Sequence, residues 1–294
     1  MLEFRKTVIV AVLLFTAIIS GAQSEKLELT QKYLIAGQLD SAKVAIDAAS
    51  LHPSTMTDAQ TWYMKGFVYK EMYKKKEKDN VKSSLRLQAV EYFKKSIKLD
   101  TTKENKENND KNLSYLANSF NKNAKFAIDS GKYELAIECY DRYRDIMIDI
   151  SNPLELKKKD VEFYLALGSL YYSIYESNKK TKVGFLEFTK KAYEKVLSSD
   201  RDNLNANYGL GILYYNEGAE LANQTDYDVD LVMFGDVQDK VVKLFQKSLP
   251  YMQKAYALNP KRKDILIGLY GIYYGLYEFD KANEFKRMAD AIDK

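Results

Sequence analysis

The sequence predicts an all-α protein built from a repeated helical unit. The 294 residues include only 13 Gly and 4 Pro, fewer than the many tight turns of an all-β protein need. Hydrophobic residues make up 46% of the chain, which is enough for a sizeable core. Apolar residues recur at helical spacing, and several of the segments that carry them align with one another. We therefore expect long helices arranged as an array.

The first element is a targeting segment over residues 1–22. Arg5 and Lys6 give it a positive start, and a 13-residue apolar stretch follows over Thr7–Ile19. Ser20-Gly21-Ala22 then supplies the small residues that a signal peptidase inspects. A helix of this length rises only about 20 Å, short of the roughly 30 Å hydrocarbon core of a bilayer. We predict a cleaved signal peptide, a mature chain with no stable membrane span, and export to the periplasm or outside the cell; an uncleaved anchor or a buried helix is the alternative.

Four segments of the mature chain contain a glycine followed three residues later by a tyrosine. They are Trp62–Tyr69, Tyr164–Tyr171, Asn207–Tyr214 and Ile267–Tyr274. Apolar residues at helical spacing precede the glycine in each. A second helical pattern recurs as well, in which a small residue is followed one turn later by a large one, as in Ala89 and Phe93.

On these residues the sequence resembles the tetratricopeptide repeat (TPR) family, whose unit of about 34 residues carries W-x2-L-G-x2-Y, then A-x3-F, then P. The resemblance covers nearly all of residues 23–294. It implies an all-α, right-handed superhelical solenoid of about six helical hairpins, with extended turns between the two helices of a hairpin. A single hairpin cannot bury its apolar face alone, so neighbouring hairpins stack on one another.

The resemblance assigns residues to three columns, which we expect to be structural because small side chains let helices approach closely. The small column of the first helices holds Thr30, Gly66, Ala124, Gly168, Gly211 and Gly271. The small column of the second helices holds Ala42, Ala89, Ala136, Thr189, Ser248 and Ala282. The tyrosine column holds Tyr33, Tyr69, Tyr171, Tyr214 and Tyr274, with Ala127 as the exception.

The spacing of these units exceeds that of the family. Consecutive members of the first column are 36, 58, 44, 43 and 60 residues apart. Much of the excess falls inside hairpins, at residues 71–86, 173–187 and 217–245. These segments are either edge insertions of the kind that bind partners or longer helices joined by ordinary loops, and both interpretations stay open. Residues 101–116 are so polar that we expect a linker between hairpins.

Few residues suit catalysis. The chain has one His (His52) and one Cys (Cys139), which excludes most nucleophile–base pairs, any thiol–imidazole metal cage and any internal disulfide. His52 stands beside Pro53 in a turn between repeats, and Cys139 lies in a helical pattern that favours a buried core residue. We predict no enzyme activity and no cofactor.

Two short motifs fail on inspection. Asp226–Asp230 resembles the start of a calcium loop, but Leu231 and Val237 stand where the loop needs Gly and Glu. Gly209 and Gly211 fail as a nucleotide motif because Tyr214 stands at the next required Gly. We therefore predict no metal site.

The charges are well mixed. The 45 basic and 41 acidic residues give a formal net charge of +4. The densest basic run, Lys74–Asp79, is already diluted by acids, so we interpret it as a solvated turn. Nucleic-acid binders usually concentrate their basic side chains. We predict no nucleic-acid partner.

The resemblance also implies a concave groove on the first helices, which in the family takes extended peptides or a partner's helix. The register places ten residues in it: Tyr63, Phe67, Lys70, Asn118, Asn121, Lys125, Tyr172, Tyr208, Tyr215 and Asn216. Asn and Lys suit a peptide backbone or a carboxylate, and Tyr offers apolar area with a polar tip. Asn121 and Lys125 stand in reversed order relative to the two-carboxylate clamp of the family's chaperone adaptors, so that specificity is not carried over. The alternative is that these side chains pack against one another or face water.

The function expected from the sequence is an exported, periplasmic scaffold that binds a protein or peptide partner through its groove and edge insertions. A carbohydrate or small-ligand binding protein of the cell envelope is the alternative, because tyrosine-lined grooves can stack on sugars. An enzyme that uses a carboxylate pair ranks third, since no spacing singles out such a pair.

Overall fold

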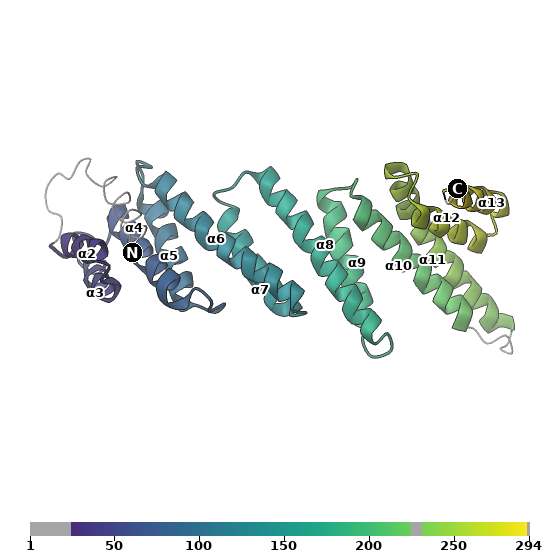
Figure 1. Ribbon diagram of the computed structural model, residues 1–294, viewed down its shortest axis with the longest axis horizontal. Helices are drawn as coiled ribbons and strands as arrows, with labels where there is room; N and C mark the ends of the chain where they lie inside the picture. The colour runs from purple at the N-terminus through teal and green to yellow at the C-terminus, as the bar shows by residue number, and fades with distance from the viewer. Residues whose placement is uncertain (1–24, 225–230, 293–294) are drawn as a thin grey trace. The chain divides into compact units, whose positions relative to one another are not determined.

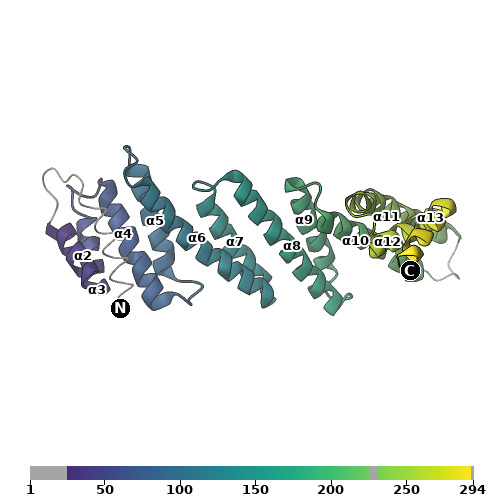
Figure 2. The same cartoon turned by 45° about the horizontal axis from the view of Figure 1, so that its top comes forward.

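The computed structural model describes residues 25–224 and 231–292, and these form helices, turns and loops without any strand. Twelve α-helices follow one another along this part of the chain. The predicted signal peptide and the calcium-like segment Asp226–Asp230 lie outside the described residues. The helices form hairpins, and in each hairpin the first helix lies beside the second (Figures 1 and 2). The all-α class and the hairpin pairing are confirmed, whereas the right-handed superhelix stays a prediction.

The six hairpins correspond to the six units expected from the sequence. Their helices are α2 (Glu25–Ile35) with α3 (Leu39–Ala49), α4 (Ala59–Met72) with α5 (Ser84–Leu99), α6 (Lys106–Asp129) with α7 (Tyr133–Met147), α8 (Pro153–Ser177) with α9 (Gly184–Ser199), α10 (Leu204–Gln224) with α11 (Leu231–Leu258), and α12 (Lys263–Gly275) with α13 (Phe279–Ala291).

The chain divides into two compact units. Within the described residues, the N-terminal unit comprises residues 25–127 and 134–152, and the C-terminal unit comprises residues 128–133, 153–224 and 231–292. Among the helices described in these units, none combines the length and the hydropathy needed to cross a bilayer.

The predicted small residues of the second helices are the most deeply buried column. All six are between 0% and 1% exposed: Ala42, Ala89, Ala136, Thr189, Ser248 and Ala282. In the first helices, a Cβ on Gly66 would lie 2.8 Å from the ring of Phe93, and one on Gly168 would lie 2.6 Å from the ring of Tyr193. These distances are shorter than a real Cβ contact, so the glycines are needed for the helices to pack this closely.

The last hairpin departs from the expected register. Tyr274, assigned to the buried tyrosine column, is 56% exposed, while Tyr273 is 4% exposed and stacks on Phe285 at a centroid distance of 5.6 Å. The cause is a glycine face on α12. Cβ atoms on its glycines would meet side chains of α10 and α11, with Gly268 against Met252, Gly271 against Tyr215 and Gly275 against Phe245. This face turns toward the preceding hairpin, so the assignment of Tyr274 to the core is wrong.

The excess length inside hairpins four and five consists of longer helices. Helix α8 runs for 25 residues before a short loop leads into α9, and α11 runs for 28 residues. In the second hairpin, α4 continues into a π-helical turn over Tyr73–Glu77. The longer-helix interpretation is therefore the one observed in the described residues.

The predicted polar linker at residues 101–116 is wrong, because α6 begins at Lys106. Leu113 and Leu116 are 1% and 0% exposed, and Asn109 donates from Nδ2 to Oγ of Ser96 on α5 at 3.0 Å. The polar residues form the solvated face of an amphipathic helix. The few apolar residues on the opposite face are enough to pack this helix against its neighbours.

Helix α11 contains a proline in its interior, Pro250. Proline has no backbone N–H, so the carbonyl of Gln246, four residues earlier, loses its helical donor. Further along the helix, Met252 and Ala255 are fully buried in the core of the C-terminal unit.

Candidate functional site

In the N-terminal unit, the predicted groove residues Tyr63 and Phe67 of α4 are buried. They are 4% and 7% exposed, and their ring centroids are 6.4 Å apart. The ring of Tyr63 also lies 5.9 Å from that of Phe93 on α5. Burial raises the pKa of the Tyr63 phenol to about 12, partly offset by a hydrogen bond with Asn112 of α6. Both aromatic side chains thus contribute to packing.

Lys70 belongs to a buried polar cluster on α4. Its ammonium donates to Oδ1 of Asn112 at 2.6 Å, lies 3.0 Å from Glu71, and sits 4.2 Å from the ring centroid of Phe67. Burial lowers the pKa of the Lys70 ammonium, and the adjacent Glu71 carboxylate opposes that shift. Lys74 also pairs with Glu71, at 3.1 Å. The charge on Lys70 is therefore compensated within the unit.

The three candidates on α6 share one face of that helix. Asn118 and Lys125 are exposed, and Asn121 is half-buried. They follow one another at intervals of three and four residues, which places them in one row along the helix. This row leaves its amide and ammonium groups open to water.

In the C-terminal unit, the structure brings predicted residues of two helices into contact. Tyr172 of α8 and Asn216 of α10 form a side-chain hydrogen bond. Burial raises the pKa of the Tyr172 phenol, and the carboxylate of Glu176 raises it further. The rings of Tyr172 and Tyr175 lie 6.1 Å apart. Tyr172 thus has polar partners on two helices, Glu176 on α8 and Asn216 on α10.

Tyr208 extends this arrangement to α12. Its phenol hydrogen-bonds with Asp264, and the guanidinium carbon of Arg262 lies 4.3 Å from its ring centroid. Arg262 and Asp264 pair through two contacts of 2.8 Å. Burial raises the pKa of the Tyr208 phenol, with Asp264 as the next cause and a smaller contribution from Tyr172. We call Tyr172, Tyr208 and Asn216 the tyrosine face.

Tyr215, also predicted for the groove, lies in a different setting. Its ring stacks on Phe245 at a centroid distance of 5.7 Å, and its hydroxyl occupies the space that a side chain on Gly271 would fill. Tyr215 therefore joins α10 to α11 and α12 as a packing residue.

One cleft was missed in the sequence. Tyr214, Lys247, Pro250 and Tyr251 line an open cleft of about 500 Å³ between α10 and α11. The rings of Tyr214 and Tyr251 are nearly parallel, with an angle of 15° and a centroid distance of 6.1 Å. The ammonium of Lys190 lies 4.7 Å from the Tyr214 centroid. We call this the Tyr214 cleft. The sequence indicates it only through the four-residue spacing of Lys247 and Tyr251, which places both side chains on one face of a helix.

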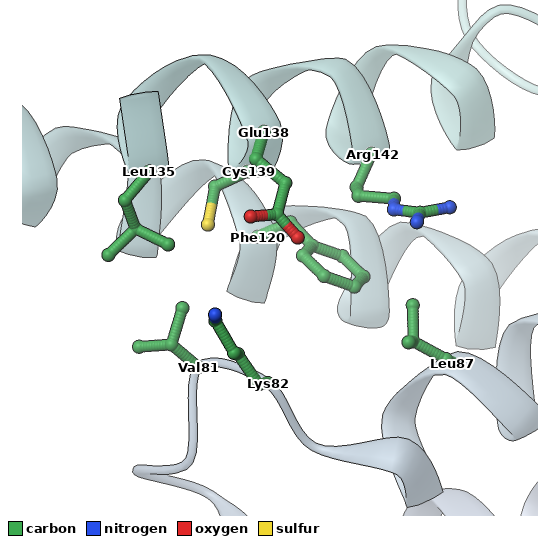
Figure 3. A pocket seen from close by; sticks show the side chains of 8 residues that line it. All are labelled: Val81, Lys82, Leu87, Phe120, Leu135, Glu138, Cys139 and Arg142. Carbon is green, nitrogen blue, oxygen red and sulfur yellow. The ribbon is translucent and has the colours of Figure 1, made fainter. Parts of the chain in front are cut away.

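A second, smaller cavity lies in the N-terminal unit and is shown in Figure 3. It has a volume of about 140 Å³ and lies where the loop before α5 meets α5, α6 and α7. We call it the Cys139 cavity. Five residues supply apolar groups or the thiol, namely Val81, Leu87, Phe120, Leu135 and Cys139, and three are charged, namely Lys82, Glu138 and Arg142. In Figure 3 Lys82 lies beside Val81 and Glu138 lies beside Cys139.

The side chains that could bind a metal ion do not cluster in the described ranges 25–224 and 231–292. Over these ranges, no three His, Cys, Asp or Glu side chains gather as a metal site requires. His52 is exposed and contacts Oγ of Ser54 through Nδ1 at 2.7 Å in the turn before α4. Cys139 is 3% exposed, which confirms the expected burial, and that burial raises the pKa of its thiol.

No family model and no curated protein sequence matches the chain. Solved structures similar to it include a TPR repeats protein (BF2334) from Bacteroides fragilis NCTC 9343, with 18% identity, a TM-score of 0.46, and coverage of 92% of this chain and 96% of that one. The TPR2AB domain of yeast Sti1 in complex with pHSP90 is 17% identical, with a TM-score of 0.28 and coverage of 92% and 90%. A monomeric IFIT1 mutant with Gppp-AAAA is 10% identical, with a TM-score of 0.37 and coverage of 97% of this chain and 54% of that one. TPR repeat proteins are thus among the solved structures that resemble the chain, and these similarities carry no functional assignment.

Proposed function

We propose that the protein is an exported, periplasmic scaffold that binds a protein or peptide partner, with the tyrosine face as its main contact surface. Export rests on the sequence of residues 1–22. The contact surface rests on the side chains that α8, α10 and α12 hold in place.

The observation that carries the proposal is the pair of hydrogen bonds that hold the two tyrosines of this face. Tyr172 is held by Asn216, and Tyr208 is held by Asp264. Tyr172 and Tyr208 are half-buried, and Asn216 is exposed. Ordered tyrosines supply contact area at a low entropic cost, and exposed amides supply hydrogen bonds to a peptide backbone.

The test is capture of a partner from the native envelope by the mature chain, followed by a binding measurement with the purified partner. We expect the combined variant Tyr172→Phe, Tyr208→Ala and Asn216→Ala to weaken binding at least tenfold, about 1.4 kcal/mol. The matched control is Tyr277→Ala, which removes an exposed tyrosine of the same unit outside this face. Equal losses in both variants, or no loss in either, contradict the proposed surface.

A second candidate is carbohydrate binding at the Tyr214 cleft. Two nearly parallel tyrosine rings at an open cleft, with Lys247 on its wall, suit the apolar face and the hydroxyls of a sugar ring. A screen of envelope glycans by thermal shift tests this, because a ligand of the native state raises the melting temperature. The expected signature is a shift that Tyr251→Ala abolishes and the exposed-lysine control Lys243→Ala preserves; a glycan that shifts all three proteins equally binds elsewhere.

A further inference from the structure

The Cys139 cavity is large enough for a defined chemical group. Its volume is about 140 Å³. A dry cavity of about 150 Å³ lined by Leu, Ile and Phe is known to admit benzene. Phe120, Leu135 and Cys139 present a comparable apolar lining here, and the sulfur of Cys139 points into the space beside Leu135 (Figure 3). The cavity therefore matches one ring-sized apolar group.

The charged side chains of the lining favour an anion. Lys82 and Arg142 contribute two positive charges, against one negative charge from Glu138. All three are exposed. Throughout the described residues, neither cation is engaged in an ion pair that would neutralise it. In Figure 3 the Lys82 ammonium points toward the cavity, whereas Arg142 lies at the opposite end of the lining, with Glu138 between them. A ligand's carboxylate at the cavity edge therefore has the Lys82 ammonium as its donor.

A third cation lies directly behind the wall. Arg86 of α5 is fully buried, and its guanidinium carbon is 3.6 Å from the ring centroid of Phe120. The guanidinium also donates to the carbonyl of Val81. Phe120 and Val81 both line the cavity, so the positive charge of Arg86 is separated from it by a single residue.

The partners of Arg86 leave its charge uncompensated. They are neutral oxygens: the Val81 carbonyl, Oγ of Ser119 at 3.2 Å, the hydroxyl of Tyr73 at 3.5 Å and, with the amide oriented so that its oxygen faces the guanidinium, Asn123 at 3.0 Å. Among the described residues, the Nε–H finds no acceptor. A buried cation without a counter-charge is unfavourable, and an anion placed nearby reduces that cost.

We propose that the Cys139 cavity binds a small organic carboxylate that carries one ring-sized apolar group. The apolar group lies against Phe120, Leu135 and Cys139, and the carboxylate faces the Lys82 ammonium, while Arg142 adds positive charge from the far end of the lining. This site is independent of the tyrosine face, which belongs to the other unit.

Cys139 provides a direct readout, because it is the only cysteine in the sequence. A small alkylating reagent modifies this thiol alone, and a ligand in the cavity blocks access to it. Phenylacetate is the probe, and benzyl alcohol and phenethylamine, which carry the same ring with a neutral and a cationic head, are the comparisons. We expect phenylacetate to slow alkylation in a saturable way and to raise the melting temperature, with at least a tenfold higher affinity than benzyl alcohol, and phenethylamine to bind more weakly still.

Two variants separate the head from the ring. The combined Lys82→Gln and Arg142→Gln variant should lose at least tenfold in phenylacetate affinity while benzyl alcohol binds unchanged, and the exposed-lysine control Lys98→Gln should match the wild type. Leu135→Trp should fill the cavity and abolish protection by both ligands. Equal affinity for phenylacetate and benzyl alcohol, or no saturable protection of Cys139, overturns the proposal. The Lys82 and Arg142 positions are exposed, so this outcome is readable even if Leu135→Trp fails to fold.

Discussion

A Cβ on Gly66 would lie 2.8 Å from Cδ1 of Phe93, so α4 and α5 touch at this point with no room for a side chain. We expect Gly66→Ala to destabilise the N-terminal unit by about 1–3 kcal/mol, because overpacking outweighs the helix propensity gained from alanine. Urea unfolding measures the change. Gly184→Ala is the control, since no described residue lies within 4 Å of its Cβ position, and it should be neutral or stabilising. A Gly66→Ala protein as stable as the control variant would show that Phe93 moves aside freely.

Asp47 of α3 ties three side chains together. Its carboxylate accepts from Nζ of Lys43 at 2.7 Å and from the hydroxyl of Tyr69 at 2.9 Å, and lies 3.0 Å from Nζ of Lys65. Burial alone raises the pKa of Asp47, but the hydrogen bonds from Lys43, Lys65 and Tyr69 outweigh it and lower the pKa below the usual 3.8. The carboxylate therefore stabilises the fold above this pH and loses its contribution as the pH falls through the lowered value.

We accordingly expect Asp47→Asn to reduce the free energy of unfolding by roughly 1–3 kcal/mol at neutral pH. The difference from the wild type should shrink below the usual pKa of 3.8 as the pH falls toward the lowered value. Urea unfolding at neutral and acidic pH checks both statements. A difference that is the same at every pH would mean that packing, rather than charge, makes Asp47 stabilising.

Alkaline pH should destabilise the protein through its buried tyrosines. Burial raises the pKa of Tyr63 from 10.0 to about 12. A pKa raised in the folded state means that the neutral phenol is favoured there, so this contribution is complete below pH 10.0 and is lost as the pH rises toward 12. We expect the free energy of unfolding to fall over this range, and to fall less steeply in Tyr63→Phe. The tyrosinate absorbance of the same variant should lose one of the components that titrate near pH 12; an unchanged titration would assign that component to other phenols.

The sequence of the N-terminal segment predicts the residue at which the mature protein begins. Cleavage after Ala22 leaves a chain that begins at Gln23. Intact-mass measurement of the protein recovered from the cell envelope tests this. Ala22→Tyr should block cleavage and leave the precursor mass, because the peptidase requires a small residue there. A wild-type protein that retains Met1 contradicts the signal-peptide assignment.

The fold was predictable where packing leaves a local trace. Ala89 and Phe93, or Ser248 and Met252, repeat because each second helix must present a small residue to its partner and fill the space one turn later. In the last hairpin this pattern led to a wrong prediction, because it assigned Tyr274 rather than Tyr273 to the core. Gly268, Gly271 and Gly275 all fit a small column, and only the side chains of α10 and α11 decide which of their neighbours is buried.

The candidate site was harder to predict from the sequence. Tyr172, Tyr208 and Asn216 could be chosen as candidates because they follow the repeat register. Their partners were not, because the bond from Tyr208 to Asp264 depends on how one hairpin docks on the next. The Tyr214 cleft depends likewise on the rotation of the 28-residue α11, which no repeat fixes.

Pro250 has a consequence for how the C-terminal unit opens. Since the carbonyl of Gln246 has no helical donor, the hydrogen-bonded ladder of α11 is interrupted there, and the two stretches on either side can fray separately. The later stretch carries Met252 and Ala255, both fully buried. In amide hydrogen exchange, α11 should thus behave as two segments with distinct protection, and the wall of the Tyr214 cleft lies at the point where they meet.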